Sequence, residues 1–375
     1  MNQQETPEAL RAYFQRRFDM LAACAGATAD ASANRAHGPG PGRWIPAGAL
    51  GQPDTYSAVC QESGAILAVA GNAYQGDLDQ QRWDPAGNFP QGTFLTGGLT
   101  LLRDGTALAI GFDRTVMQFR GIVYDPARPA DSAWQLTGYL TEPRREFALA
   151  LLHDGQVLAA GGVHTHFLAS ADLYDPVSMQ WRAAAQMTVA RAGTATARLR
   201  HGAAVLVIGG TTQSGEILRL VERYDADQPK PDWTTVAPMT YQRMYASAIV
   251  LPDGRVVVAG GYPASGTLEV YNPPDSSSAV GNWEKPVPLK YDRPFYPAMG
   301  IVDGGKVLIA AGGNDKAAEI YDPVKRESRP AASMSELRSF PGYCSAQDHS
   351  LVVLGGIDAT RHQLSPDTVE RFILE

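Results

Sequence analysis

Residues 251–261 read Leu-Pro-Asp-Gly-Arg-Val-Val-Val-Ala-Gly-Gly, and they are followed by Glu269-Val270-Tyr271 and by Trp283. The apolar run predicts a buried strand, and the Asp-Gly pair ahead of it is typical of a tight turn. The Gly-Gly pair lets the backbone turn where a side chain would clash. Residues 147–181 have the same order, with a third strand closing at Tyr174 and a short outer strand at Trp181. Each unit therefore predicts four short strands.

The same pattern recurs along the chain. Apolar runs end in Gly-Gly or a close variant at Gly71-Asn72, Gly111-Phe112, Gly161-Gly162, Gly209-Gly210, Gly260-Gly261, Gly312-Gly313 and Gly355-Gly356. A Tyr-Asp-Pro or a variant of it follows each one, starting at Trp83, Tyr124, Tyr174, Tyr224, Tyr271, Tyr321 and Phe372. Successive members of this second series lie 41 to 51 residues apart. A period near fifty is typical of propellers built from four-stranded blades. The sequence therefore predicts an all-β fold of seven blades.

These units resemble the kelch repeat, and the resemblance covers roughly residues 43–375. It implies a seven-bladed kelch β-propeller, here with a short N-terminal helix, and it favours a bacterial kelch protein that works without a second domain. Kelch domains usually serve as docking surfaces for peptides or proteins, so the resemblance also implies a binding role.

The last repeat predicts how the ring closes. Its strands near residues 343–346, 351–354 and 369–372 are followed by no outer strand. Arg43-Trp44-Ile45-Pro46, which precedes the first repeat, has the pattern of the missing strand. Because an unpaired strand edge is a liability, we expect residues 43–50 to complete the last blade. The alternative is an ordered tail with no closing role.

The first 42 residues form a separate segment. Thr6-Pro7 is typical of a helix start, and apolar residues from Leu10 to Leu21 mark one helical face. We expect a helix over residues 7–25, followed by a Pro- and Gly-rich linker to residue 42. This helix would dock on the propeller or mediate self-association. Arg16-Arg17 and Leu21–Cys24 resemble export signals, but Asp19 and Asp30 leave no long uncharged apolar stretch.

Composition limits the class of partner. The chain has 375 residues and a formal net charge of −7, which argues against a nucleic-acid partner. It contains no apolar run of about eighteen residues, so we expect no membrane span. Three cysteines do not make a disulfide framework, which favours a cytoplasmic location.

The repeat also separates two faces of the ring. The turns between first and second strands and those after the Tyr-Asp-Pro motifs are short and uniform, and we call their side the plain face. The loops after each Gly-Gly pair and the segments that lead into each inner strand form the variable face. These segments differ in length and content, as binding loops on a rigid scaffold do. We expect function on the variable face, around the mouth of the central channel.

The segments that lead into the inner strands are rich in arginine and tyrosine. Guanidinium groups recognise carboxylate or phosphate, and tyrosines give amphipathic walls. We therefore predict a substrate site at the mouth, with Glu146, Tyr245 and Tyr343 as catalytic candidates. The predicted substrate-binding residues are Tyr56, Arg145, Arg191, Arg243, Arg293, Tyr296, Arg338, His164 and His166. An alternative applies to the four regularly spaced arginines at 191, 243, 293 and 338, which would then only tie neighbouring blades together.

His164 and His166 would place two imidazoles on one side of an extended segment, which is half of a metal site. His362 belongs to another blade, nearly across the ring, so a shared tetrahedral site would need a further ligand. We expect these histidines to be solvated or hydrogen-bonded, and we expect no metal and no cofactor.

Within this architecture the chain also resembles galactose-oxidase-like copper radical oxidases. Their site needs a Tyr-His pair at the start of one inner strand, and Arg243-Met244-Tyr245-Ala246-Ser247 resembles that segment. Ala246 occupies the place of the histidine, so we do not expect copper oxidase chemistry. Bacterial kelch propellers of the sialate mutarotase type imply another option, which is cofactor-free proton transfer on a small acid held by arginines.

Two classes of function remain open. In the first, the mouth is the active site of a cofactor-independent isomerase, lyase or cyclase that acts on a polar or anionic small molecule, with Glu146 or a tyrosine as acid and base. In the second, the mouth is a docking surface for a peptide or protein. Fold alone does not decide between them.

Overall fold

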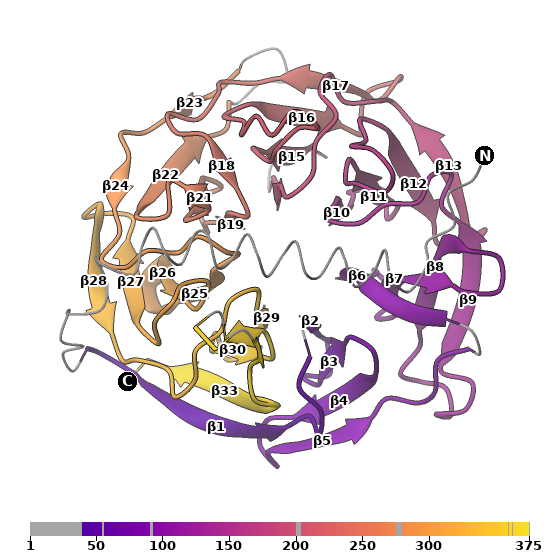
Figure 1. Ribbon diagram of the computed structural model, residues 1–375, viewed down its shortest axis with the longest axis horizontal. Helices are drawn as coiled ribbons and strands as arrows, with labels where there is room; N and C mark the ends of the chain where they lie inside the picture. Colours follow the sequence, from indigo (N-terminus) through magenta and orange to yellow (C-terminus); the bar gives the residue numbers. More distant parts are fainter. Residues whose placement is uncertain are drawn as a thin grey trace.

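Each fifty-residue unit folds into one antiparallel sheet, and seven such sheets surround a central axis in the computed structural model (Figure 1). The structure describes residues 40–54, 56–90, 93–199, 204–274, 280–358, 360–361 and 363–374. The predicted all-β fold of seven blades is confirmed. The predicted helix over residues 7–25 and His362 lie outside the described residues. Within the described ranges, the only helical element is a 3-10 turn at Asp303–Gly305, and no helix is long and apolar enough to cross a bilayer.

The blades follow one another around the ring. The first three consist of β2 (Ser57–Cys60), β3 (Ile66–Val69), β4 (Ala73–Asp77) and β5 (Arg82–Pro85); β6 (Thr93–Leu101), β7 (Ala107–Asp113), β8 (Gln118–Tyr124) and β9 (Trp134–Tyr139); and β10 (Ala148–Leu151), β11 (Val157–Ala160), β12 (Ala171–Asp175) and β13 (Gln180–Ala184). The fourth and sixth consist of β14 (Ala195–Arg198), β15 (Ala204–Ile208), β16 (Val221–Asp225) and β17 (Asp232–Thr235), and of β25 (Ala298–Val302), β26 (Lys306–Ala310), β27 (Ala318–Asp322) and β28 (Glu327–Ala331).

The fifth blade contains β19 (Ser247–Val250), β20 (Val256–Ala259), β22 (Thr267–Asn272) and β23 (Asn282–Trp283), and β24 (Val287–Pro288) also pairs with β22. The seventh contains β29 (Gly342–Ser345), β30 (Leu351–Leu354), β33 (Thr368–Ile373) and β1 (Arg43–Ala49). Two small hairpins, β18 (Arg243–Met244) with β21 (Tyr262–Pro263) and β31 (Ile357–Asp358) with β32 (Gln363–Leu364), belong to the variable face. Strands β2, β10, β19, β25 and β29 lie nearest to the axis in Figure 1.

The hydrophobic core lies between neighbouring blades. The second strand of each blade is buried, except for the partly exposed Lys306 at the start of β26, and in β20 (Val256–Ala259) all four residues have no exposed area. Tyr224 packs on Trp233 with ring centroids 5.1 Å apart. The indole nitrogen of Trp233 donates to the carbonyl oxygen of Ala185 in the preceding blade, at 2.8 Å. The tyrosine and tryptophan of the repeat therefore join successive blades.

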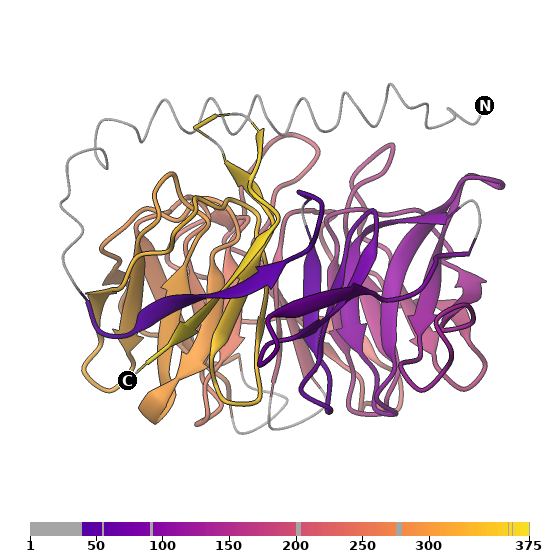
Figure 2. The same cartoon turned by 90° about the horizontal axis from the view of Figure 1, so that it is seen from below.

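Strand β1 is the outer strand of the seventh blade. It runs antiparallel to β33, with Arg43 opposite Ile373 and Trp44 opposite Phe372. The rings of Trp44 and Phe372 are 5.3 Å apart, and the indole nitrogen of Trp44 donates to the carbonyl oxygen of Ala332 in the sixth blade at 2.8 Å. Figure 1 shows β1 beside β33, and Figure 2 shows from the side how β1 crosses from the sixth blade toward the first. The first described strand of the chain thus completes the sheet that the last strand leaves open.

The Gly-Gly turns allow two blades to approach each other closely. Gly209 has a φ of +63°, and a Cβ there would lie 2.3 Å from the carbonyl oxygen of Arg243 in the next blade. No other residue fits this position without moving the segment that leads into the next inner strand.

Deletion of residues 1–50 should reduce the free energy of unfolding by about 3–5 kcal/mol or more, because it removes β1 and leaves a cavity where Trp44 packs. Deletion of residues 1–36 keeps β1 and should leave the melting temperature nearly unchanged. Thermal unfolding of both truncated proteins measures this. Equal melting temperatures would mean that β1 does not secure the ring.

Trp233→Ala should lower the free energy of unfolding by roughly 3–5 kcal/mol, since it opens a cavity between two blades and breaks the bond to Ala185. Val177→Ala is the matched control, because Val177 is 93% exposed, and it should change stability by less than about 0.5 kcal/mol. Chemical denaturation compares the two. A Trp233→Ala protein as stable as the control would contradict the packing described above.

Candidate functional site

Five residues at corresponding positions form an arc around the mouth of the channel on the variable face. Each lies two residues before its inner strand and has a positive φ. They are Glu146 (51°), Gly193 (68°), Tyr245 (58°), Tyr296 (45°) and Phe340 (50°), and we call them the mouth ring. Because the left-handed backbone recurs from blade to blade, it belongs to the architecture of the ring.

Backbone hydrogen bonds connect the mouth ring. The amide of Gly193 donates to the carbonyl of Glu146 at 3.1 Å, and that of Tyr245 donates to the carbonyl of Gly193 at 2.8 Å. The amide of Tyr296 donates to the carbonyl of Tyr245 at 2.6 Å. Because these bonds fix the backbone, the mouth ring presents its side chains from a rigid support.

Two of the predicted catalytic residues meet at this ring. The hydroxyl of Tyr245 donates to Oε2 of Glu146 at 3.1 Å, although the two residues come from the fifth and third blades. The ring of Tyr245 passes over Gly193 of the blade between them, where a Cβ would lie 2.9 Å from a ring carbon. Tyr245 is 6% exposed, whereas Glu146 is partly exposed. Gly193 therefore opens the path by which Tyr245 reaches Glu146.

An aromatic cluster continues from Tyr245 across the fifth to seventh blades. Its ring centroid lies 5.3 Å from that of Tyr296 and 5.6 Å from that of Phe340, both edge to face. Phe340 also stacks on Phe295 at 5.3 Å. Tyr296 is the partly exposed member. The predicted residue Tyr296 thus lies beside the Glu146–Tyr245 pair and shapes its surroundings.

The four regular arginines do not line the mouth, and this prediction was wrong. Their side chains have no exposed area, and each pairs with a carboxylate on the third strand of its own blade. The pairs are Arg191–Glu222, Arg243–Glu269 at 3.0 Å, Arg293–Glu319 at 3.8 Å and Arg338–Glu370 at 3.4 Å. Arg144 pairs in the same way with Asp172 at 3.0 Å. The alternative given above, a role in tying neighbouring blades together, holds only in that the role is structural, because each of these ion pairs lies within a single blade.

Burial explains why these charges occur in pairs. Burial lowers the pKa of the Arg243 guanidinium, and the neighbouring Glu269 carboxylate acts in the opposite direction. Burial raises the pKa of Glu319, while Arg293 lowers it. An unpaired buried charge is strongly destabilising, so each arginine is committed to its blade.

The sequence contains a signal for these ion pairs. An acid stands two residues before each corresponding aromatic of the repeat, as Glu269 does before Tyr271.

Tyr56 and Tyr343 also lie away from the Glu146–Tyr245 pair. Tyr56 is 4% exposed, and its hydroxyl donates to the carbonyl of Gln52 at 3.0 Å, so its role in substrate binding stays a prediction. Tyr343 lies on β29 and lines a separate central cavity of about 490 Å³ formed by the inner strands. Burial raises the pKa of Tyr343, although a hydrogen bond with the Ser247 side chain lowers it. The predicted catalytic role of Tyr343 stays a prediction.

Arg145, His164 and His166 lie together above the third blade. The backbone of Arg145 exchanges two hydrogen bonds of 2.9 Å with Val163. The guanidinium carbon of Arg145 lies 5.8 Å from the ring centroid of Phe119, and the ring of His164 lies 6.3 Å from the same centroid. His166 is exposed, with Nε2 3.6 Å from Oε1 of Glu142. Arg144 occupies the position of the regular buried arginines, and Arg145 is the next residue in the chain. Arg145 is the one predicted arginine that is partly exposed.

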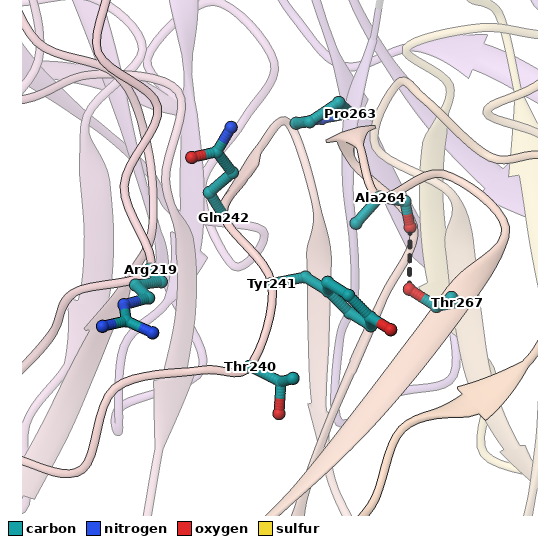
Figure 3. A pocket seen from close by; sticks show the side chains of 7 residues that line it. All are labelled: Arg219, Thr240, Tyr241, Gln242, Pro263, Ala264 and Thr267. Carbon is teal, nitrogen blue, oxygen red and sulfur yellow. Dashed lines mark hydrogen bonds between the residues drawn. The ribbon is translucent and has the colours of Figure 1, made fainter.

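A pocket that sequence reasoning missed lies on the variable face between the fourth and fifth blades (Figure 3). It has a volume of about 590 Å³. Its walls are Arg219, the segment Thr240–Gln242, and Pro263, Ala264 and Thr267. Three separate loops contribute these residues, so no single stretch of sequence marks the site. Tyr241 has a counterpart in Tyr291 ahead of Arg293, so the sequence pattern does not single it out.

The residues of the mouth do not fit a copper centre. Ala246 is buried at the place where the resemblance to radical oxidases needs an imidazole. Within the described ranges, no group of three or more His, Cys, Asp or Glu side chains is arranged to hold a metal ion. We therefore derive no step through a metal.

Parts of the chain are similar in sequence to known kelch proteins. No family model matches the chain. It is 33% identical over 132 residues to kelch-like protein 25 of Rattus norvegicus, and 30% identical over 151 residues to alpha-scruin of Limulus polyphemus. These matches cover 32% and 37% of this chain, but only 21% and 15% of the two relatives.

A solved structure shares the fold over most of the chain. It is a fungal alcohol oxidase described as showing catalytic diversity among the AA5 family, in complex with copper, with a TM-score of 0.70 and 14% identity. The match covers 89% of this chain and 76% of the oxidase. At this identity the likeness shows the fold alone. Together with the seven repeated units, their Gly-Gly turns and their Tyr–Trp contacts, these findings show a seven-bladed β-propeller built from kelch-type repeats.

Proposed function

We propose that the protein acts on a polar small molecule at the channel mouth, as a cofactor-independent enzyme of the isomerase, lyase or cyclase type. The observation that carries this proposal is the 3.1 Å hydrogen bond between Tyr245 and Glu146. A carboxylate beside a phenol is a pair that can remove a proton and stabilise the oxygen on which charge develops. The rigid mouth ring holds both groups in place, as acid–base catalysis requires.

In this reaction the Glu146 carboxylate removes a proton from a carbon next to a substrate carbonyl. The Tyr245 hydroxyl, which donates to Glu146 in the substrate-free protein, turns to donate to the carbonyl oxygen. Return of the proton from Glu146 to another atom completes an isomerisation, and loss of a leaving group instead completes an elimination. The partly exposed Tyr296 would form one wall.

The arginines that are not neutralised by a buried carboxylate indicate the charge of the substrate. The four buried arginines are neutralised within their blades, so they offer nothing to an anion. Arg145 is the remaining predicted arginine and lies next to Glu146 in the chain, with His164 close by. We therefore propose a polar substrate, with any negative charge directed toward Arg145.

Glu146→Gln and Tyr245→Phe should each slow proton exchange by roughly 10²–10⁴-fold, because each removes one partner of the acid–base pair. Proton NMR in D₂O measures deuterium uptake into a panel of aldoses, 2-oxo acids and hydroxy ketones. Melting temperatures should stay close to that of the unmodified protein, since Glu146 is partly exposed. Glu142→Gln, a change of a nearby partly exposed carboxylate, is the control. If the Glu146→Gln protein catalysed deuterium exchange as fast as the unmodified protein, the proposal would be refuted.

Gly193→Ala should reduce exchange about as much as Tyr245→Phe does, because a methyl group there displaces the ring of Tyr245 from Glu146. Gly215→Ala is the matched control, since Gly215 also has a positive φ of 82°, but a Cβ there would meet no atom within 4 Å. Both changes strain the backbone by about 1 kcal/mol or more, so stability alone does not separate them. Equal exchange rates in the two variants would show that the path over Gly193 is not needed.

Docking of a peptide or protein is the second candidate function. Exposed apolar side chains on two hairpins of the variable face favour it, namely Val116 (49%) and Met117 (37%) between β7 and β8, and Leu364 (41%) on β32. Two results together would support this role over catalysis. No compound of the panel would exchange, and the protein would form a defined complex that Met117→Ser and Leu364→Ser abolish.

A further inference from the structure

The pocket between the fourth and fifth blades has its own chemistry, independent of the Glu146–Tyr245 pair. Neither member of that pair lines it. Its volume of about 590 Å³ falls within the range of small-molecule sites. Figure 3 shows Tyr241 in the middle of the lining, with Arg219 and Gln242 to one side and Ala264 and Thr267 to the other.

A buried ion pair holds both walls of this pocket. On one wall, the Glu269 carboxylate accepts from the amides of Thr240 at 2.7 Å and Tyr241 at 3.2 Å. On the other wall, the guanidinium of Arg243 donates to the carbonyl of Ala264 at 3.0 Å and to Oγ1 of Thr267 at 2.8 Å. Because Arg243 and Glu269 also bind each other at 3.0 Å without exposure to solvent, the pocket is formed before any ligand arrives.

Arg219 is the charged residue of the lining. Its backbone is anchored, since its carbonyl accepts from the amide of Met239 at 2.9 Å. Its side chain is exposed, and among the described residues no carboxylate lies within ion-pairing distance of its guanidinium. No carboxylate belongs to the lining either. A fixed cavity with one uncompensated guanidinium favours a ligand that carries a carboxylate.

The remaining lining favours a flat apolar body on that ligand. Tyr241 is 44% exposed, and the guanidinium carbon of Arg243 lies 6.0 Å from its ring centroid, which supports the ring within the pocket wall. Pro263 and the methyl group of Ala264 add apolar surface, and the side-chain amide of Gln242 adds a donor and an acceptor. An aromatic ring offers both the flat shape and the apolar area that such walls accept.

We infer that this pocket binds a small aromatic carboxylate, whose carboxylate meets Arg219 and whose ring packs against Tyr241. The ligand is held on a site separate from the mouth, so its binding does not depend on the proposed acid–base chemistry.

The test uses 2-naphthoate and its neutral isostere 2-naphthamide as probes of the full-length protein, followed by saturation-transfer difference NMR titration. We expect saturable binding of naphthoate, and binding of naphthamide at least about tenfold weaker because it lacks the charge. Arg219→Gln should raise the dissociation constant for naphthoate by about tenfold or more and leave that for naphthamide nearly unchanged. Tyr241→Ala should weaken both probes by roughly two- to tenfold.

Arg329→Gln provides the matched control, because Arg329 is an exposed arginine on the outer strand β28 and does not line the pocket. It should bind both probes as the unmodified protein does, and so should Glu146→Gln. Absence of saturable naphthoate binding, equal affinity for naphthoate and naphthamide, or equal affinity of the Arg219→Gln and Arg329→Gln proteins would each overturn the inference. Melting temperatures confirm that the exposed substitutions leave the fold intact.

Discussion

A buried ion pair between the arginine ahead of an inner strand and a carboxylate on the third strand is the interaction on which the variable face depends. It recurs in five consecutive blades, as Arg144–Asp172, Arg191–Glu222, Arg243–Glu269, Arg293–Glu319 and Arg338–Glu370. Each guanidinium also donates to carbonyl oxygens at the Gly-Gly turn and beyond it, as Arg338 does to Gly355 at 2.9 Å and to Thr368 at 2.8 Å. A loop that would otherwise expose its backbone is thus fixed from within. Replacement of either partner alone would leave an uncompensated buried charge.

This internal support determines what remains for function. With the regular arginines committed to the blades, the side chains that differ from blade to blade are left to carry the proposed chemistry. At the mouth ring those are Glu146, Tyr245 and Tyr296, which stand on a hydrogen-bonded backbone. In the pocket between the fourth and fifth blades they are Tyr241, whose amide donates to Glu269 of a buried ion pair, and Arg219, whose carbonyl accepts from the amide of Met239. Both proposed sites combine a repeated backbone support with side chains that vary among the blades, and the two sites would differ in chemistry.

The sequence predicted the ring well because the fold depends on features that repeat. The Gly-Gly and Tyr-Asp-Pro series mark each blade. Glu146 and Tyr245 stood out because they break the repeat, yet their contact over Gly193 depends on a left-handed backbone and on blade spacing that no motif encodes. The prediction that the regular arginines line the mouth was wrong because the residue type does not tell whether the side chain is buried or exposed. Only the acids that precede the repeat aromatics, such as Glu222 before Tyr224, pointed to burial.

The burial of these paired arginines is tested most directly by labelling the native protein with phenylglyoxal. Peptide mass spectrometry then measures the modification of each arginine. The reagent modifies guanidinium groups that solvent reaches. We expect Arg191, Arg243, Arg293 and Arg338 to stay unmodified while Arg219 and Arg329 react, and we expect all of them to react once the protein is unfolded. If the four paired arginines of the native protein were modified as fast as Arg329, they would not be buried. Their charges would then be open to a ligand at the mouth, which contradicts the ion-paired arrangement.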